Sequence, residues 1–336
     1  MHPFKKLKTK EETKMIKRED RLKMDVPTHK YIDIVNNHTF SISVTGFKHF
    51  FMPDFDVEMI LKQMFKTVDE NGKIPSSSQS DYRGMSRGQV LRAFKKTAEE
   101  GTKVHAMIEH FLIKYLDDPN IINLSREEQM KLICPLGEKL SEENERCCMQ
   151  FFDFIVPFIK EQQWIPYRME MLIFIEEYDI AGSIDCIFKK RGKEEYAVID
   201  WKRTKTPLRQ INYKHKTCFY PFEEYNSSAL SGFQIQVNLY AYILKHKYDL
   251  NVTLCAIVQL NPKQKKHKFE VVGLIENDIV IGLRTYKKNL DFMEKFKKWS
   301  TDMKASFSNI HPSLPFPCYY EDKNEYENSN STIIQI

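Results

Sequence analysis

The stretch EEYAVIDWKRT, residues 194–204, has the pattern of a buried β-strand that ends in charged residues. Its alanine, valine and isoleucine residues are typical of a strand inside a sheet. Because side chains alternate between the two faces of a strand, Asp200 and Lys202 point the same way, about 7 Å apart along the backbone. Ile199 and Trp201 point to the opposite face.

Two further β-rich runs precede this strand, RMEMLIFIEEY at residues 168–178 and AGSIDCIFKK at residues 181–190. The short charged or turn-forming links between the runs favour an antiparallel meander. A meander sets Asp185 beside Asp200, so that two carboxylates converge next to one lysine. The alternative is that Asp185 is a surface acid near a turn, and that Asp200 and Lys202 form an exposed ion pair.

Two carboxylates that meet on a buried face predict a bound cation. Like charges at close range repel each other, and a divalent cation removes that repulsion. Oxygen ligands suit Mg²⁺ or Mn²⁺, which polarise phosphoryl oxygens and lower the pKa of bound water. Lys202 would then orient the nucleophile or stabilise the transition state of phosphodiester hydrolysis.

Helical and strand patterns surround this meander. Helices are expected over residues 56–67, from Ser86 through Ala98, after Gly101, and over residues 125–163 with an interruption at Pro135. A hairpin is expected over residues 31–45, a further helix over 232–245, and strands over 253–260 and 268–276. Gln236 and Tyr240 lie one helical turn apart beside an apolar stripe, and His105 lies at the margin of another, so their polar groups need partners.

These motifs in this order resemble the RecB-type branch of the PD-(D/E)xK nuclease superfamily. The resemblance rests on GTKVHAMIE at residues 101–109, Glu170, GSID at 182–185, DWK at 200–202 and Gln236-x-x-x-Tyr240, and it covers roughly residues 101–260. Mitochondrial genome maintenance exonucleases and viral or phage exonucleases look most similar. The resemblance implies an α/β fold with the restriction-endonuclease-like core, a central mixed β-sheet flanked by helices.

The resemblance also implies roles for individual residues. Mg²⁺ or Mn²⁺ would be held by His105, Glu170, Asp185, Asp200 and the backbone carbonyl of Trp201, and the catalytic set would be Lys202, Asp185, Asp200, Gln236 and Tyr240. Several relatives hold an iron–sulfur cluster through one early cysteine and three that follow the QxxxY helix. Here Cys255 and Cys318 are the cysteines after that helix, so no cluster is expected.

The implied activity is a DNA exonuclease that acts on DNA ends or single-stranded DNA in replication, repair or recombination. A catalytically silent nucleic-acid-binding module on the same scaffold is the alternative, and a structural protein with coincidental motifs is a second one.

The roles of two further segments stay open at the level of the sequence. The run KQKKHK, residues 263–268, is a solvated hairpin tip or a phosphate contact, and residues 206–222 stack on single strands or simply pack as a loop.

Length and composition set the outer limits of these expectations. With 336 residues, 42% hydrophobic residues and a net charge of +5, the chain is expected to be globular, and its charge does not by itself demand a polyanionic partner. We expect a basic flexible tail over residues 1–30, a hairpin and helical segment over 31–100, the nuclease domain over 101–300 and a C-terminal tail over 301–336.

No apolar run suggests a membrane span or secretory signal, and seven scattered cysteines fit a reducing compartment. A cytoplasmic or nuclear location is expected, a mitochondrial one stays open, and the sequence leaves the oligomeric state open.

Overall fold

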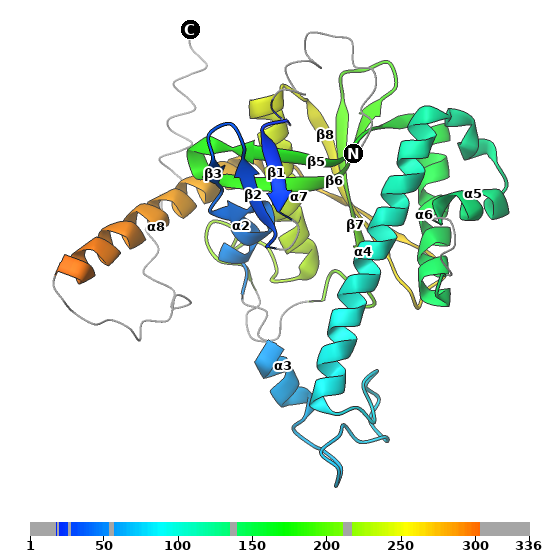
Figure 1. Cartoon of the computed structure of the whole chain (residues 1–336), viewed down its shortest axis with the longest axis horizontal. Coiled ribbons are helices and arrows are strands. Elements are labelled where there is room, and N and C mark those ends of the chain that lie inside the picture. Colours follow the sequence, from blue (N-terminus) through cyan, green and yellow to red (C-terminus); the bar gives the residue numbers. More distant parts are fainter. Residues whose placement is uncertain are drawn as a thin grey trace.

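The computed structural model describes residues 18–302, apart from residue 19 and residues 26–27, 54–56, 135–139 and 211–216. Within these residues, a six-stranded mixed sheet lies between layers of helices (Figure 1). The predicted α/β class with a central mixed sheet flanked by helices is therefore confirmed. The expected C-terminal tail falls outside the described residues from position 303 onward, as do the first 17 residues of the expected N-terminal tail.

The sheet begins with an antiparallel meander of three strands, as the sequence predicts. It consists of β5 (Trp164–Ile175), β6 (Ile180–Lys190) and β7 (Tyr196–Arg203). β8 (Val252–Leu260) then pairs in parallel with β7, because α7 (Ala229–Tyr248) carries the chain back to the other end of the sheet. β9 (Lys268–Val272) pairs antiparallel with β8 and completes this side.

The strand pairing leaves a gap beside the middle of β6. On the edge of β6 that faces away from β5, β4 (Ile42–Ser43) pairs with residues 180–181, and β7 pairs with residues 186–189. Residues 182–185 lie between these two ladders, at the point where β6 and β7 diverge. The predicted functional residues of both strands lie around this gap.

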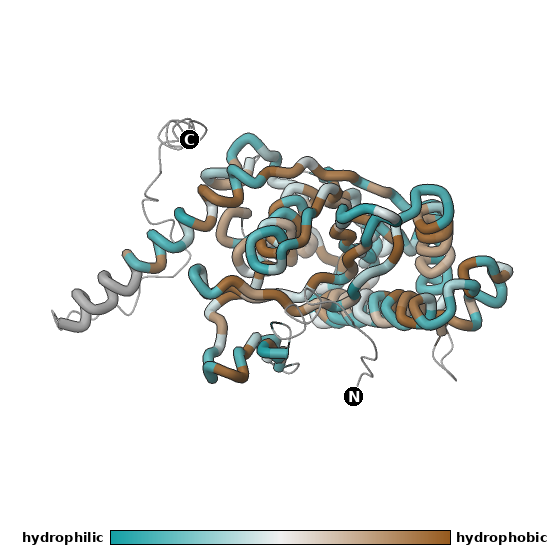
Figure 2. Tube along the Cα trace, turned by 90° about the horizontal axis from the view of Figure 1, so that it is seen from above, coloured by the Kyte–Doolittle hydropathy of each residue, from teal (hydrophilic) through white to brown (hydrophobic). Residues whose placement is uncertain are grey.

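Helices cover both faces of the sheet and follow its alternating side chains. The face to which Val198 points packs against α2 (Val44–Phe50), α7 and α8 (Glu276–Asp302). The face to which Ile199 and Trp201 point packs against α4 (Arg87–Asp117) and α6 (Glu142–Lys160), with α5 (Arg126–Ile133) beside those two helices. Hydrophobic stretches accordingly run through the middle of the molecule in Figure 2. Within the described part of the chain, no helix combines the length and apolar character needed to cross a membrane.

Smaller elements extend this core toward the N-terminus. β1 (Leu22–Asp25) lies within the segment expected to be a flexible tail and pairs with β2 (Lys30–Asp33). β2 also pairs with β3 (His38–Thr39), within the expected hairpin. α3 (Val57–Met64) packs against the start of α4 in a cluster of its own. The 3₁₀ turns η1 (Pro119–Asn123) and η2 (Glu176–Tyr178) follow α4 and β5.

Two details of the helices differ from the sequence prediction. The expected break near Gly101 is wrong, because α4 is one helix of 31 residues. Glycine in a helix interior destabilises the helix by about 1 kcal/mol relative to alanine, but it keeps its backbone hydrogen bonds. The strong helix formers around Gly101 therefore keep this part of the chain helical. The hairpin expected through Thr45 ends earlier, because Ser43 caps α2 by accepting a hydrogen bond from the backbone N–H of Gly46.

Two glycine-to-alanine variants test this packing. A Cβ at Gly182, in the gap, would lie 2.9 Å from Val44 Cγ2 and 3.1 Å from Tyr240 Cε1, so Gly182→Ala should destabilise the fold by about 1–3 kcal/mol. Gly101→Ala is the matched control, because nothing lies within 4 Å of its added Cβ. That variant should stabilise α4 by up to about 1 kcal/mol. Urea unfolding measures both changes, and equal effects would contradict this account of the gap.

Candidate active site

Asp185 lies where β6 and β7 separate. Its Oδ2 accepts a hydrogen bond from the backbone N–H of Trp201 at 3.0 Å, so the carboxylate takes the place of a strand partner for β7. Trp201 follows Asp200 directly in the chain, and this bond therefore brings the two aspartates together. Burial raises the pKa of Asp200, and the nearby negative charge of Asp185 raises it further.

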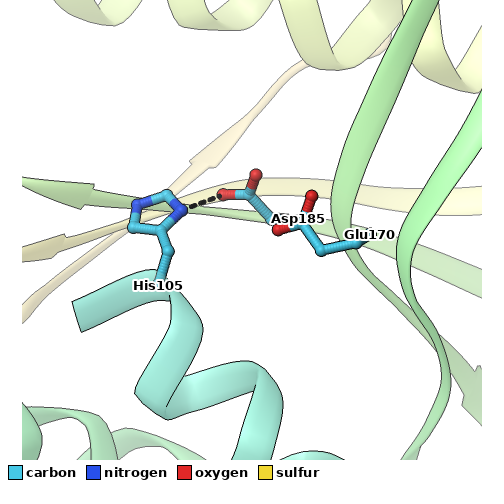
Figure 3. Close-up of side chains that lie close together, drawn as sticks. All are labelled: His105, Glu170 and Asp185. Carbon is cyan, nitrogen blue, oxygen red and sulfur yellow. Dashed lines mark ion pairs between the residues drawn. The ribbon is translucent and has the colours of Figure 1, made fainter. Parts of the chain in front are cut away.

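The side chains of His105, Glu170 and Asp185 come from three different elements and lie close together (Figure 3). His105 comes from α4, Glu170 from β5 and Asp185 from β6, and one potential ligand atom of each lies within 4.8 Å of the others. His105 Nδ1 lies 3.4 Å from Asp185 Oδ2. Such a group of one imidazole and two carboxylates can hold a metal ion.

Glu170 is held in a conformation that costs energy. Its φ angle is +46°, in the left-handed region that residues other than glycine rarely adopt, although its neighbours Met169 and Met171 pair regularly with β6. Ser183 Oγ donates a hydrogen bond to Glu170 Oε2 at 2.8 Å. The residue as a whole is exposed, but its carboxyl lies against protein atoms, and the resulting loss of hydration raises its pKa to about 7, with a further contribution from Asp185.

Asp200 and Lys202 form an ion pair on the side of β7 that faces α7. Lys202 Nζ lies 2.6 Å from Asp200 Oδ2, and the Asp200 side chain is 2% exposed, so the alternative of an exposed ion pair is wrong. Burial opposes the charge of Lys202, but Asp200 and Asp185 outweigh burial and raise the pKa of Lys202. Lys202 is therefore an ammonium at neutral pH.

Helix α7 adds two polar groups to this ion pair. Gln236 Nε2 donates to Asp200 Oδ1 at 3.5 Å and to the Tyr240 hydroxyl at 3.2 Å. Both side chains are buried, so these contacts supply the partners that the sequence pattern requires. The remaining amide atom, Gln236 Oε1, accepts a hydrogen bond from Lys48 Nζ at 3.1 Å.

The donor atoms around the gap fit a hard divalent cation. Carboxylate oxygens and imidazole nitrogen are ligands that Mg²⁺ and Mn²⁺ accept. Asp200 lies beside the group of His105, Glu170 and Asp185 rather than in it, and its Oδ2 is paired with the Lys202 ammonium. A carboxylate oxygen has two lone pairs, so a cation with Asp185 and Asp200 among its ligands is compatible with this ion pair. The backbone carbonyl of Trp201 as a ligand stays a prediction.

Three residues near the site are not among the predicted site residues. Ser183 lies inside the GSID motif, and Glu109, one turn after His105 on α4, adds to the raised pKa of Glu170. Both could have been found from these positions. Lys48 gives no such signal, because it contacts Gln236 across 188 positions of the chain.

The segments 263–268 and 206–222, whose roles the sequence leaves open, form ion pairs within the protein. Lys263 pairs with Asp81, and Arg209 pairs with Glu270 at 2.6 Å. Tyr213, Lys214 and Lys216 of the segment 206–222 lie outside the described residues.

Two solved structures are remotely similar to this chain. A search of curated proteins finds no match. Among solved structures, the chain is similar to a candidate exonuclease from Eubacterium rectale, with 12% identity over 58% of this chain and 68% of that chain and a TM-score of 0.34. It is also similar to SSO0001, with 13% identity over 59% of this chain and 86% of that chain and a TM-score of 0.22. Likenesses this remote do not bear on function.

A family profile decides the assignment. The profile described as the PD-(D/E)XK nuclease superfamily matches residues 84–322, well over half of the chain, and this range contains the DWK motif and the group of His105, Glu170 and Asp185. The chain therefore belongs to the PD-(D/E)XK nuclease superfamily.

Proposed function

We propose that this nuclease is a Mg²⁺- or Mn²⁺-dependent deoxyribonuclease of the RecB-type branch, and that it acts as an exonuclease. The observation that carries the proposal is the group of His105, Glu170 and Asp185 beside the buried pair of Asp200 and Lys202. Carboxylates gathered next to an ammonium suit phosphodiester hydrolysis, in which negative charge develops on the phosphoryl oxygens.

The residues of the site divide into ligands and supporting groups. His105, Glu170, Asp185 and Asp200, with the backbone carbonyl of Trp201, would hold the cation. When bound, the cation lowers the pKa of a bound water molecule and neutralises charge on the phosphate. Lys202 is charged and held by Asp200, so it can orient the nucleophile or donate to a phosphoryl oxygen. Gln236 holds the Asp200 carboxylate from α7, and the Tyr240 hydroxyl accepts a hydrogen bond from the same Gln236 amide.

Exonuclease action on DNA follows from the resemblance of the ordered motifs to the RecB-type branch. Within that branch, QxxxY nucleases commonly process DNA ends, and Gln236 and Tyr240 occupy those two positions here. The proposed substrate is accordingly DNA that is single-stranded or has free ends, in replication, repair or recombination.

Removing the ammonium of Lys202 tests the site. Lys202→Met should lower the rate of Mg²⁺-dependent cleavage of end-labelled DNA by about 100- to 1000-fold, because a charge that stabilises the transition state is lost. Lys189→Met, on β6 and paired with Glu194 far from the gap, is the matched control and should keep full activity. Chelator should abolish cleavage by the wild type. Equal rates for both variants would refute the site, and DNA binding without cleavage by the wild type would favour the silent binding module.

The choice between ends and internal bonds is tested with matched substrates. Linear and covalently closed circular single-stranded DNA of the same sequence should behave differently, because an exonuclease needs a terminus. We expect release of short products from the linear form and an intact circle. Linearisation of the circle at a comparable rate would show endonuclease action instead.

Proton competition at Glu170 predicts a pH dependence of metal binding. The raised pKa of about 7 means that this carboxyl is largely protonated at pH 6 and ionised at pH 8. Because a cation binds the ionised form, Mn²⁺ affinity should fall about tenfold from pH 8 to pH 6 when measured by calorimetry. Glu170→Gln should bind more weakly at pH 8 and show a flatter pH dependence. An unchanged slope in this variant would exclude Glu170 as the titrating group.

A further inference from the structure

Lys48 enters the site from outside the part of the chain that matches the family profile. It lies on α2, before residue 84, and its Nζ donates to Gln236 Oε1. The residue is 8% exposed. Its stem crosses α7 at Gly232, where an added Cβ would lie 3.2 Å from Lys48 Cδ. The lysine is thus built into the contact between α2 and α7.

The surroundings of Lys48 make it costly to keep as an ammonium. Burial lowers its pKa to about 8, and the positive charge of Lys202 contributes to that decrease. The two ammonium groups lie beside the same ring, with Lys48 Nζ 4.8 Å and Lys202 Nζ 4.7 Å from the centroid of Phe233. The direct hydrogen-bond partner of Lys48 is a neutral amide, which compensates a buried charge less than a carboxylate does. A group held at such a cost is better explained by function than by stability.

The hydrogen bonds of Gln236 show what this lysine can do. A glutamine amide has one accepting oxygen and one donating NH₂ group, and an ammonium donates only. With Lys48 at Oε1, the NH₂ group must face Asp200 Oδ1 and the Tyr240 hydroxyl. Without Lys48, the amide can turn over and place its oxygen against the Asp200 carboxylate, which would repel it.

We propose that Lys48 is a positioning residue that fixes the amide of Gln236, so that its NH₂ group holds the Asp200 carboxylate. The inference rests on the proposed nuclease function, and it extends the site to a helix upstream of the matched residues. Lys48 acts through Gln236 and Asp200 and has no contact with the reacting phosphate in this role.

The kinetics of single and double variants test whether Lys48 acts through Gln236. Lys48→Met keeps the length of the stem and removes the donor, and we expect kcat to fall about tenfold with KM changed less than about twofold. In a Gln236→Met background, the same substitution should add no further loss, because the group that Lys48 positions is already gone. Lys48→Arg keeps a donor and should recover part of the rate. Losses that multiply in the double variant would overturn the proposal.

Stability and NMR measurements decide the question without any cleavage. Lys48→Met should leave the melting temperature unchanged or higher, whereas a fall of several degrees would assign Lys48 a structural role. The side-chain amide resonance of Gln236, identified by its loss in Gln236→Met, should shift in Lys48→Met. It should stay in place in Lys62→Met, which changes an exposed lysine of α3. An unmoved resonance in Lys48→Met overturns the inference. If the wild type cleaves no DNA, the proposed function fails while these two measurements still decide the role of Lys48.

Discussion

The hydrogen bond from the Trp201 backbone N–H to the Asp185 carboxylate joins two strands at the point where they separate. A buried N–H group left without a partner costs about 1–3 kcal/mol, and here a side chain satisfies it in place of a strand. The same contact puts Asp185 next to Asp200 and leaves space beside β6 for groups from the helices. Without the divergence of β6 and β7, regular pairing would close that space, and the two carboxylates would have no room for a shared cation.

The gap is reached from both helical layers. α4 brings His105 to Asp185, while α7 brings Gln236 to Asp200 and Tyr240 to Gln236. Ionisable groups packed this closely oppose folding, as the raised pKa values of Glu170 and Asp200 show. The surrounding sheet and helices must offset that cost, and they do so with large hydrophobic clusters on both faces. A cation would remove much of the repulsion, so the arrangement makes physical sense for a metal-binding site.

The continuity of α4 and the position of α2 both affect how the site is held. Because α4 runs unbroken through Gly101, His105 lies inside a long helix rather than at the loose start of a short one. Val44 and Phe47 of α2 belong to the same hydrophobic cluster as α7, so the segment before the matched residues is part of the folded core. That packing carries Lys48 to Gln236 and gives the chain a contact with the site that the nuclease motifs do not include.

Local sequence patterns predict the meander, the common face of Asp200 and Lys202, and the spacing of Gln236 and Tyr240. These follow from periods of two and 3.6 residues, which are local properties of the chain. The three-dimensional packing of the chain was needed to show that β8 runs parallel to β7, that α4 continues through Gly101, that Asp200 pairs with Lys202 beside the other ligands, and that Lys48 contacts Gln236. Such contacts depend on how distant elements pack against each other, and no periodicity within one segment encodes the packing of two segments far apart in the chain.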